Sequence, residues 1–247
     1  MKSTIWLMGG LGNQLFQFNY GSYLKSIGYS VVYSDYLTKR NFSTRLLNWK
    51  IHEFCPIEDQ DIVSIKPLTA VGVTLLAKAP LLNHVSNFYR ASEIKPKSLN
   101  IFGYFQDFFE VIDSNSFLSM KPMRRESSIV CHLRMTDTLW NKEYTSRIIR
   151  EFLDYPSSID MKKIVVTDHP ELARNMFSSD ITVVKRSVKE DFDLMRAASV
   201  LFLSNSTFSF WAAKLGSNQM IYAPKTPLFE YGLKSLNIEK LRFYDDV

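Results

Sequence analysis

The sequence predicts an α/β protein with mostly parallel β-sheets covered by helices, and three observations support this class. Apolar strand-like runs alternate with stretches of helical periodicity over the last hundred residues, a pattern typical of a parallel sheet covered on both faces. The chain opens with a strand, a glycine-rich turn, a helix and a second strand, which is a βαβ unit. Its 247 residues are 46% hydrophobic and 22% charged, a globular composition that suits one large domain or two of about 120 residues.

The opening unit is defined by its apolar runs and its glycines. Residues 4–8 and 31–34 are expected strands, and the helix between them ends at Gly28. The expected apolar face of this helix consists of Phe16, Tyr20, Tyr23, Leu24 and Ile27. The turn after the first strand, residues 9–14, contains three glycines.

This glycine turn has several interpretations. A dinucleotide fingerprint would use Asp35 to bind a ribose, but its third glycine would stand at position 15, which is Leu15. An NAD(P)-dependent oxidoreductase is therefore disfavoured. Either the turn is only a tight connection, or Gly10 and Gly12 let a ligand approach the backbone, beside the amide of Asn13.

The middle of the chain is less regular, and a boundary follows it. Residues 101–109 are strongly aromatic and are expected to form a buried strand that leads into a helix. Pro122 lies among charged residues, between an apolar segment and a new strand, which is typical of a linker. We therefore expect two domains, residues 1–122 and residues 123–247.

In the second half the alternation is regular. Expected strands are residues 128–133, 163–166, 181–184, 200–203 and 219–223, and expected helices are residues 143–153, 170–177, 190–198 and 207–215. Polar residues follow three of these strands, at 132–137, 167–169 and 204–207. Because ligands bind at the carboxyl ends of parallel strands, we expect these three segments to form one crevice.

Two features of this crevice suit a phosphate. The turn at residues 204–207 precedes a helix whose free N–H groups, with small hydroxyls beside them, can bind an anion; the alternative is an ordinary N-cap. Arg134 follows a buried strand, and its planar guanidinium can grip a phosphate with two hydrogen bonds. The alternative for Arg134 is a salt bridge to Asp137 or Asp168.

Metal and nucleophile motifs are not found. The four histidines lack paired-ligand spacing, and there is no nucleophile elbow. Two acidic doublets, Asp59 with Asp61 and Asp191 with Asp193, are expected to be charges near helix starts. We therefore expect no metal and no cofactor.

Charge and cysteine content suggest the surroundings of the protein. A net charge of +5 and a pI near 9.0 fit anionic partners. The two cysteines, Cys55 and Cys131, suggest a reducing compartment without disulfides. The first residues lack the apolar length of a signal peptide, and no window approaches a membrane span. A cytoplasmic protein is expected, with peripheral contact to a membrane left open.

The sequence resembles the bacterial α-1,2-fucosyltransferases, which share three motifs with α-1,6- and protein O-fucosyltransferases. Residues 9–17 are similar to G-G-x-G-N-Q-x-F-Q and residues 103–106 to G-Y-F/W-Q. His132-Leu133-Arg134 with Asp137 is similar to H-x-R-R-x-D, Thr167-Asp168 to S-D, and Asp193-Leu194-Met195 with residues 204–211 to D-L-x-L-M followed by S-N-S-S/T-F-S-W-W. The chain departs from the family at Met135, where the family has a second arginine.

The resemblance implies a GT-B-type enzyme in which two Rossmann-like domains face a central cleft. Residues 1–122 would bind the acceptor and residues 123–247 the GDP-sugar, with metal-independent, inverting transfer. The residues implied in catalysis are Arg134, which would neutralise the β-phosphate, and Asn13, which would reach across from the acceptor domain. Asp137 is a further catalytic candidate because of its position after Arg134. The residues implied in donor binding are Gly10, Gly12, His132, Asp168, Ser204, Asn205, Ser206, Thr207 and Phe208.

The expected reaction is transfer of L-fucose from GDP-fucose to the 2-hydroxyl of a galactose. The acceptor would be an oligosaccharide or lipid-linked glycan, for example in O-antigen and lipopolysaccharide biosynthesis. Met135 leaves GDP-colitose open as the donor, and the general base is open among Asp137, Asp168, His132 and Glu143. A non-catalytic nucleotide- or RNA-binding module is a further alternative, but nucleic acid is disfavoured because lysines and arginines are scattered.

Overall fold

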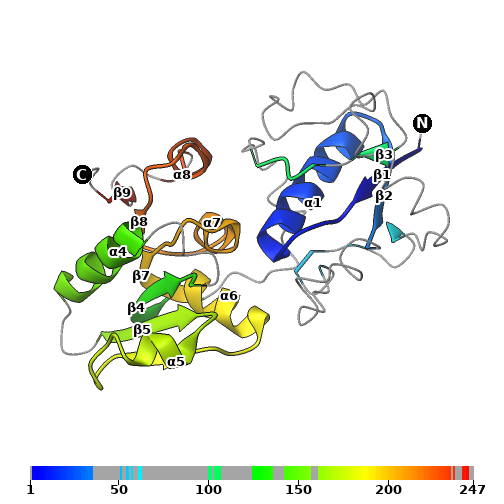
Figure 1. Ribbon diagram of the computed structural model, residues 1–247. Helices are drawn as coiled ribbons and strands as arrows, with labels where there is room; N and C mark the ends of the chain where they lie inside the picture. The colour runs from blue at the N-terminus through cyan, green and yellow to red at the C-terminus, as the bar shows by residue number, and fades with distance from the viewer. Residues whose placement is uncertain are drawn as a thin grey trace. The chain divides into compact units, whose positions relative to one another are not determined.

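The computed structural model divides the chain into two compact units, Met1–Met120 (unit 1) and Lys121–Val247 (unit 2). The division lies beside the linker expected at Pro122. The residues described by the structure are 2–35, 51, 54–55, 57, 61–62, 100–101, 103–106, 124–135, 142–156, 161–234, 236 and 241–244. Each unit contains its own parallel β-sheet (Figure 1), which confirms the predicted α/β class.

Unit 1 contains the predicted βαβ opening. Its elements are β1 (Lys2–Trp6), α1 (Leu11–Ser26), β2 (Ser30–Ser34) and β3 (Asn100–Ile101). The strand order is β2-β1-β3, and both pairings are parallel. The first strand therefore lies at the centre, with the later strands on either side of it.

Helix α1 packs closely on this sheet because Gly21 has no side chain. A β-carbon added at Gly21 would meet Tyr33 Oη and would lie 2.9 Å from Ile5 Cδ1. The predicted apolar face is confirmed for Phe16 and Leu24, which are fully buried. Ile27 is a correction: it is 47% exposed, because it lies beyond the last helical turn, just before the chain reverses at Gly28 with φ +92°.

Unit 2 is a six-stranded parallel sheet with helices between its strands. Its strands are β4 (Glu126–Leu133), β5 (Lys162–Thr167), β6 (Thr182–Val184), β7 (Ala198–Phe202), β8 (Met220–Ala223) and β9 (Leu241–Phe243). Its helices are α4 (Lys142–Asp154), α5 (Pro170–Arg174), α6 (Val188–Ala197), α7 (Thr207–Lys214) and α8 (Pro227–Gly232). All nine elements predicted in this half are confirmed, although α5 ends three residues early; α8 and β9 were not predicted.

In the strand order β6-β5-β4-β7-β8-β9, the two middle strands lie where the order of successive strands switches direction along the sheet, which we call the strand reversal; the strands themselves are all parallel. From β4 the chain builds outward through β5 to β6, and it then returns to the other side of β4 and continues outward from β7. This is the order of doubly wound nucleotide-binding folds, whose ligands bind outside the carboxyl ends of the two strands at the reversal. Here those strands are β4 and β7.

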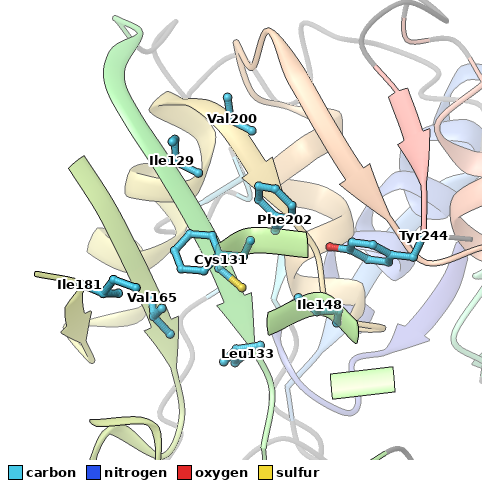
Figure 2. Close-up of a cluster of buried hydrophobic side chains, with 10 residues drawn as sticks. Ile129, Cys131, Leu133, Ile148, Val165, Ile181, Val200, Phe202 and Tyr244 are labelled. Atoms are coloured by element: carbon cyan, nitrogen blue, oxygen red, sulfur yellow. The ribbon is translucent and has the colours of Figure 1, made fainter. Parts of the chain in front are cut away.

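A buried hydrophobic cluster on one face of the sheet fixes these two strands (Figure 2). Cys131 and Leu133 of β4 and Phe202 of β7 point into it, together with Ile148 and Phe152 of α4. The rings of Phe152 and Phe202 meet edge to face, with centroids 5.7 Å apart. Helix α4 thereby covers the centre of the sheet and holds the ends of β4 and β7 in place.

No helix in the described parts of the chain has both the length and the apolar character needed to cross a membrane.

Candidate functional site

The candidate site lies at the carboxyl ends of β4 and β7, the two strands at the reversal. Strand β4 ends at Leu133 and is followed by Arg134, and β7 ends at Phe202 and is followed by the turn that starts α7. The structure thus brings together two of the three polar segments that the sequence predicted to meet. The third, after β5, joins them through Asp168.

His132 lies between Cys131 and Leu133, whose side chains enter the cluster of Figure 2. Because side chains alternate along a strand, His132 points to the opposite face of the sheet. There its Nδ1 lies 2.7 Å from Ser204 Oγ, and its ring lies 5.8 Å from the ring of Phe208. Burial, assisted by the charge of Arg134, lowers the pKa of His132 to about 4. The imidazole is therefore neutral at physiological pH.

Three serines shape the turn between β7 and α7. Ser206 caps the helix, because its Oγ accepts a hydrogen bond from Phe208 N at 3.3 Å. Ser209 Oγ donates to the carbonyl oxygens of Ser204 and Ser206, at 3.1 and 3.0 Å. Ser209 was not predicted as a site residue, although a hydroxyl three residues after an N-cap is a usable signal. The side chains of Asn205, which is exposed, and Thr207 take no part in these bonds.

Asp168 connects the ends of β4 and β5. Its Oδ1 accepts a hydrogen bond from Met135 N at 2.8 Å, and its backbone carbonyl accepts one from Lys185 Nζ at 2.8 Å. Lys185 follows β6, so a second cation, also missed from the sequence, lies at this edge of the sheet near Arg134, which is exposed. The basic pair Lys185-Arg186 directly after a strand was its signal. Such an edge suits an anionic ligand.

Three acidic residues of the two doublets are described, and each has partners of its own. Asp193 pairs with Lys189 and Arg196, at 2.6 and 3.1 Å, whereas the buried carboxylate of Asp191 accepts from Arg186 N at 3.2 Å. Asp61 pairs with Lys25 at 2.7 Å, and Asp59 lies outside the described residues. Where side chains are described, no group of three or more histidine, cysteine or acidic residues could hold a metal ion.

Two candidates for the general base cannot be placed. Asp137 lies outside the described residues, and so does the side chain of Glu143, although Glu143 belongs to α4.

In unit 1 the glycine turn and the segment after β3 are held together by side-chain amides. Gln17 is fully buried; its Oε1 accepts from Met8 N at 3.0 Å, and its Nε2 donates to Gly103 O at 2.8 Å. Gln14 Nε2 donates to Gly9 O at 3.0 Å. Gln106 Nε2 donates to Asn13 Oδ1 at 2.8 Å. The two motifs at residues 9–17 and 103–106 therefore form one connected structure, and Asn13 is part of it.

Comparison with known proteins gives structural likenesses only. No family model and no curated protein matches the sequence. A NodZ α-1,6-fucosyltransferase crystallised with GDP is 11% identical over 90% of this chain and 94% of that chain, with a TM-score of 0.45. Fucosyltransferase NodZ from Bradyrhizobium is 12% identical over 90% and 95%, with a TM-score of 0.44. A NodZ α-1,6-fucosyltransferase soaked with GDP-fucose is 13% identical over 90% and 94%, with a TM-score of 0.42.

Proposed function

We propose that this chain is an inverting glycosyltransferase that moves L-fucose from GDP-fucose to the 2-hydroxyl of a galactose. The observation that carries the proposal is that Arg134 and the serine-rich start of α7 follow β4 and β7, which are paired neighbours in the sheet of unit 2. The acceptor would be a galactose-containing oligosaccharide, free or lipid-linked, as in O-antigen synthesis. The enzyme would act in the cytoplasm, in peripheral contact with the membrane when the acceptor is lipid-linked.

The diphosphate of the donor would occupy the start of α7. The first backbone N–H groups of this helix and the positive end of its dipole favour an anion there. The first turn of α7 contains no acidic residue that would occupy this position. Arg134 would add a guanidinium that matches two phosphate oxygens, and Lys185 a second positive charge.

These groups would act most strongly when the donor bond breaks. The acceptor hydroxyl would attack the anomeric carbon from the face opposite the diphosphate, and negative charge would grow on the departing β-phosphate. Fixed donors and cations aimed at that charge lower the barrier. Side chains would supply this stabilisation here, so we propose transfer without a metal ion or cofactor.

Among the candidate bases, His132 is disfavoured by its surroundings. Its pKa of about 4 makes it a weak base at neutral pH, and its Nδ1 is engaged with Ser204. We propose instead that the neutral imidazole helps to bind the donor nucleotide. One oxygen of Asp168 is also committed, to Met135 N. Asp137 and Glu143 remain candidates for the base.

Met135 favours a second candidate donor. Its side chain packs against the hydrophobic cluster of unit 2, where the family pattern has an arginine. One guanidinium fewer beside the diphosphate would weaken donor binding or accompany a different sugar on the same GDP, and GDP-colitose is that alternative donor. Thermal unfolding with GDP-fucose, GDP-colitose and GDP would rank them, because the ligand that binds most tightly raises the midpoint most.

The direct test removes the guanidinium of Arg134. The Arg134→Ala variant should bind GDP roughly ten- to a hundredfold more weakly by calorimetry, since a charged hydrogen bond contributes about 1.5–3 kcal/mol. It should also lose transfer of labelled fucose from GDP-fucose to lactose, measured in EDTA. The matched control is Arg125→Ala, because exposed Arg125 precedes the amino end of the same strand. GDP binding by Arg134→Ala at the wild-type level would reject the proposal.

A further inference from the structure

In the sheet of unit 1 the order of successive strands also switches direction, and the proposed donor site does not include this position. In the order β2-β1-β3 the chain passes from β1 to β2 on one side, and β3 pairs on the other side of β1. The equivalent crevice therefore lies outside the carboxyl ends of β1 and β3. The residues that follow these strands are Leu7 to Gly10 and Gly103 to Gln106.

An amide pair stands at this position. Gln106 Nε2 donates to Asn13 Oδ1 at 2.8 Å, and neither side chain makes another hydrogen bond among the described residues. Each carboxamide has two N–H donors and one oxygen with two lone pairs. After the bond between them, the pair still offers three N–H donors and three lone pairs, two of the N–H groups on Asn13 and two of the lone pairs on Gln106. Both residues are only half-buried.

An aromatic ring lies beside the pair. A β-carbon added at Gly9, where φ is +74°, would lie 2.6 Å from Asn13 Nδ2 and 3.1 Å from Tyr104 Cε1. The amide and the half-buried ring of Tyr104 therefore lie over the same point of the backbone. Phe105 anchors the segment: its ring stacks on Tyr20 at 4.2 Å, and its φ of +52° is a strained conformation for a phenylalanine.

Gly10 adds open space next to these groups. Its φ of −73° is accessible to any residue, and a β-carbon added there would meet nothing within 4 Å. Neither backbone conformation nor packing within the described structure requires glycine at this position. A glycine with no such requirement is typical of a backbone that a ligand approaches closely. No side chain caps the start of α1 at this point.

The segments that follow β1 and β3 are uncharged. Residues 7–17 and 103–106 contain no lysine, arginine, aspartate or glutamate, in contrast to the basic edge of unit 2. Neighbouring hydroxyls of a sugar both donate and accept hydrogen bonds, which matches an amide pair that retains both N–H donors and carbonyl lone pairs. The apolar C–H face of a sugar packs well on an aromatic ring.

We propose that Tyr104, Gln106 and Asn13, with the backbone of Gly9 and Gly10, form a binding site for a neutral hexose. Resting on the function proposed above, this hexose is the galactose of the acceptor. Tyr104 supplies the stacking surface, the amide pair selects the hydroxyls, and the glycines leave room for the ring of the sugar.

The test measures two ligands on the full chain. Methyl β-galactoside and GDP are titrated separately into the wild type, Tyr104→Ala, Tyr104→Phe and Gly10→Ala, by NMR and calorimetry. We expect Tyr104→Ala and Gly10→Ala to weaken galactoside binding on the order of tenfold or more, and Tyr104→Phe to retain it, because the ring is what stacks. GDP binding should be unchanged in the two Tyr104 variants. The matched control is Tyr29→Ala, since half-buried Tyr29 precedes β2 at the opposite end of the sheet.

The outcomes separate the two proposals. Galactoside binding at the wild-type level in both Tyr104→Ala and Gly10→Ala would overturn the hexose site, and so would a wild type that binds GDP but no galactoside. Gly10→Ala introduces no clash within the described structure, so it gives an answer even if Tyr104→Ala fails to fold. A wild type that binds galactoside through Tyr104 but binds no GDP would support the hexose site and reject the proposed donor.

Discussion

At the scale of single residues, the candidate site combines side chains that are already hydrogen bonded with side chains that face solvent. His132 and Ser204 are buried and bonded to each other, and Ser206 and Ser209 hold the turn. Arg134 is exposed at the end of its strand. The first group gives the turn its shape before any ligand binds, and such preorganisation reduces the ordering that binding requires.

The neutral state of His132 has a measurable effect on stability. Its pKa is about 4 in the folded protein and about 6.5 in an unfolded chain. As the pH falls from about 6.5 to about 4, the unfolded chain takes up a proton that the folded protein does not. The free energy of unfolding should therefore fall across this window, by roughly 3 kcal/mol in total.

Urea denaturation at several pH values checks this prediction. The His132→Asn variant keeps a hydrogen-bonding partner for Ser204 but cannot titrate, so it should lose much of the decrease. The His169→Asn variant removes an exposed histidine instead and should behave as the wild type. Equal pH dependence in the wild type and His132→Asn would contradict the buried, neutral imidazole.

At the scale of elements, the two neighbouring helices α6 and α7 begin differently. Helix α6 starts with a capping box in which Ser187 and Glu190 bond reciprocally, and Asp191 adds a second acidic group to its first turn. Helix α7 is capped by Ser206 alone. The positive end of the α6 dipole is thus met by its own carboxylates, whereas the first turn of α7 contains no acidic residue.

The two caps provide a matched pair of variants. Ser206→Ala and Ser187→Ala should each lower the free energy of unfolding by about 1 kcal/mol, because each removes an N-cap. Only Ser206→Ala should also weaken GDP binding in calorimetry. If both variants bound GDP as the wild type does, the start of α7 would not be the diphosphate site.

The elements with strong periodicity could be predicted from sequence, and the weak ones could not. Strand β7 and helix α7 show clear apolar patterns, and both are confirmed within two residues. Strand β9 is three residues long and contains exposed Arg242, so it is a strand only because it pairs with β8. Short edge elements of this kind depend on tertiary pairing, which a local pattern does not contain.

The candidate site was predictable in its position but not in its connections. Polar residues after strands indicated Arg134 and the turn at Ser204. The hydrogen bonds that Met135 N and Lys185 Nζ donate to Asp168 join separate strand ends. They depend on strand order, which the sequence pattern does not give. For the same reason Asn13 could not be recognised as a partner of Gln106, 93 residues away.

At the scale of the whole molecule, each parallel sheet has a point where its strand order switches direction, and the residues that follow the strands differ in charge between the two units. Arg134 and Lys185 follow strands of unit 2, whereas residues 7–17 and 103–106 of unit 1 contain no charged side chain. A transferase needs two sites of different chemistry, one for an anionic donor and one for an uncharged acceptor.

Hydrogen exchange can test whether unit 2 binds the GDP of the donor and unit 1 binds the acceptor sugar. GDP should slow amide exchange at residues 203–210, whose first helical N–H groups would bind the diphosphate. Methyl β-galactoside should slow it at residues 9–14 and 103–106. Inorganic phosphate at the same ionic strength is the control for general charge effects. Protection by GDP confined to unit 1 would contradict the assignment of the two ligands.

The two native cysteines have a practical consequence for such experiments. Cys55 and Cys131 are both buried, neither forms a disulfide, and burial raises the pKa of each thiol. Thiolates carry the reactivity of cysteine, so these positions should resist thiol-directed dyes in the folded protein. Cysteines introduced at exposed Ser26 in unit 1 and exposed Ser179 in unit 2 would then accept a fluorophore pair without removal of the native ones. Energy transfer between the dyes would then test whether GDP or methyl β-galactoside changes the distance between the two labelled positions.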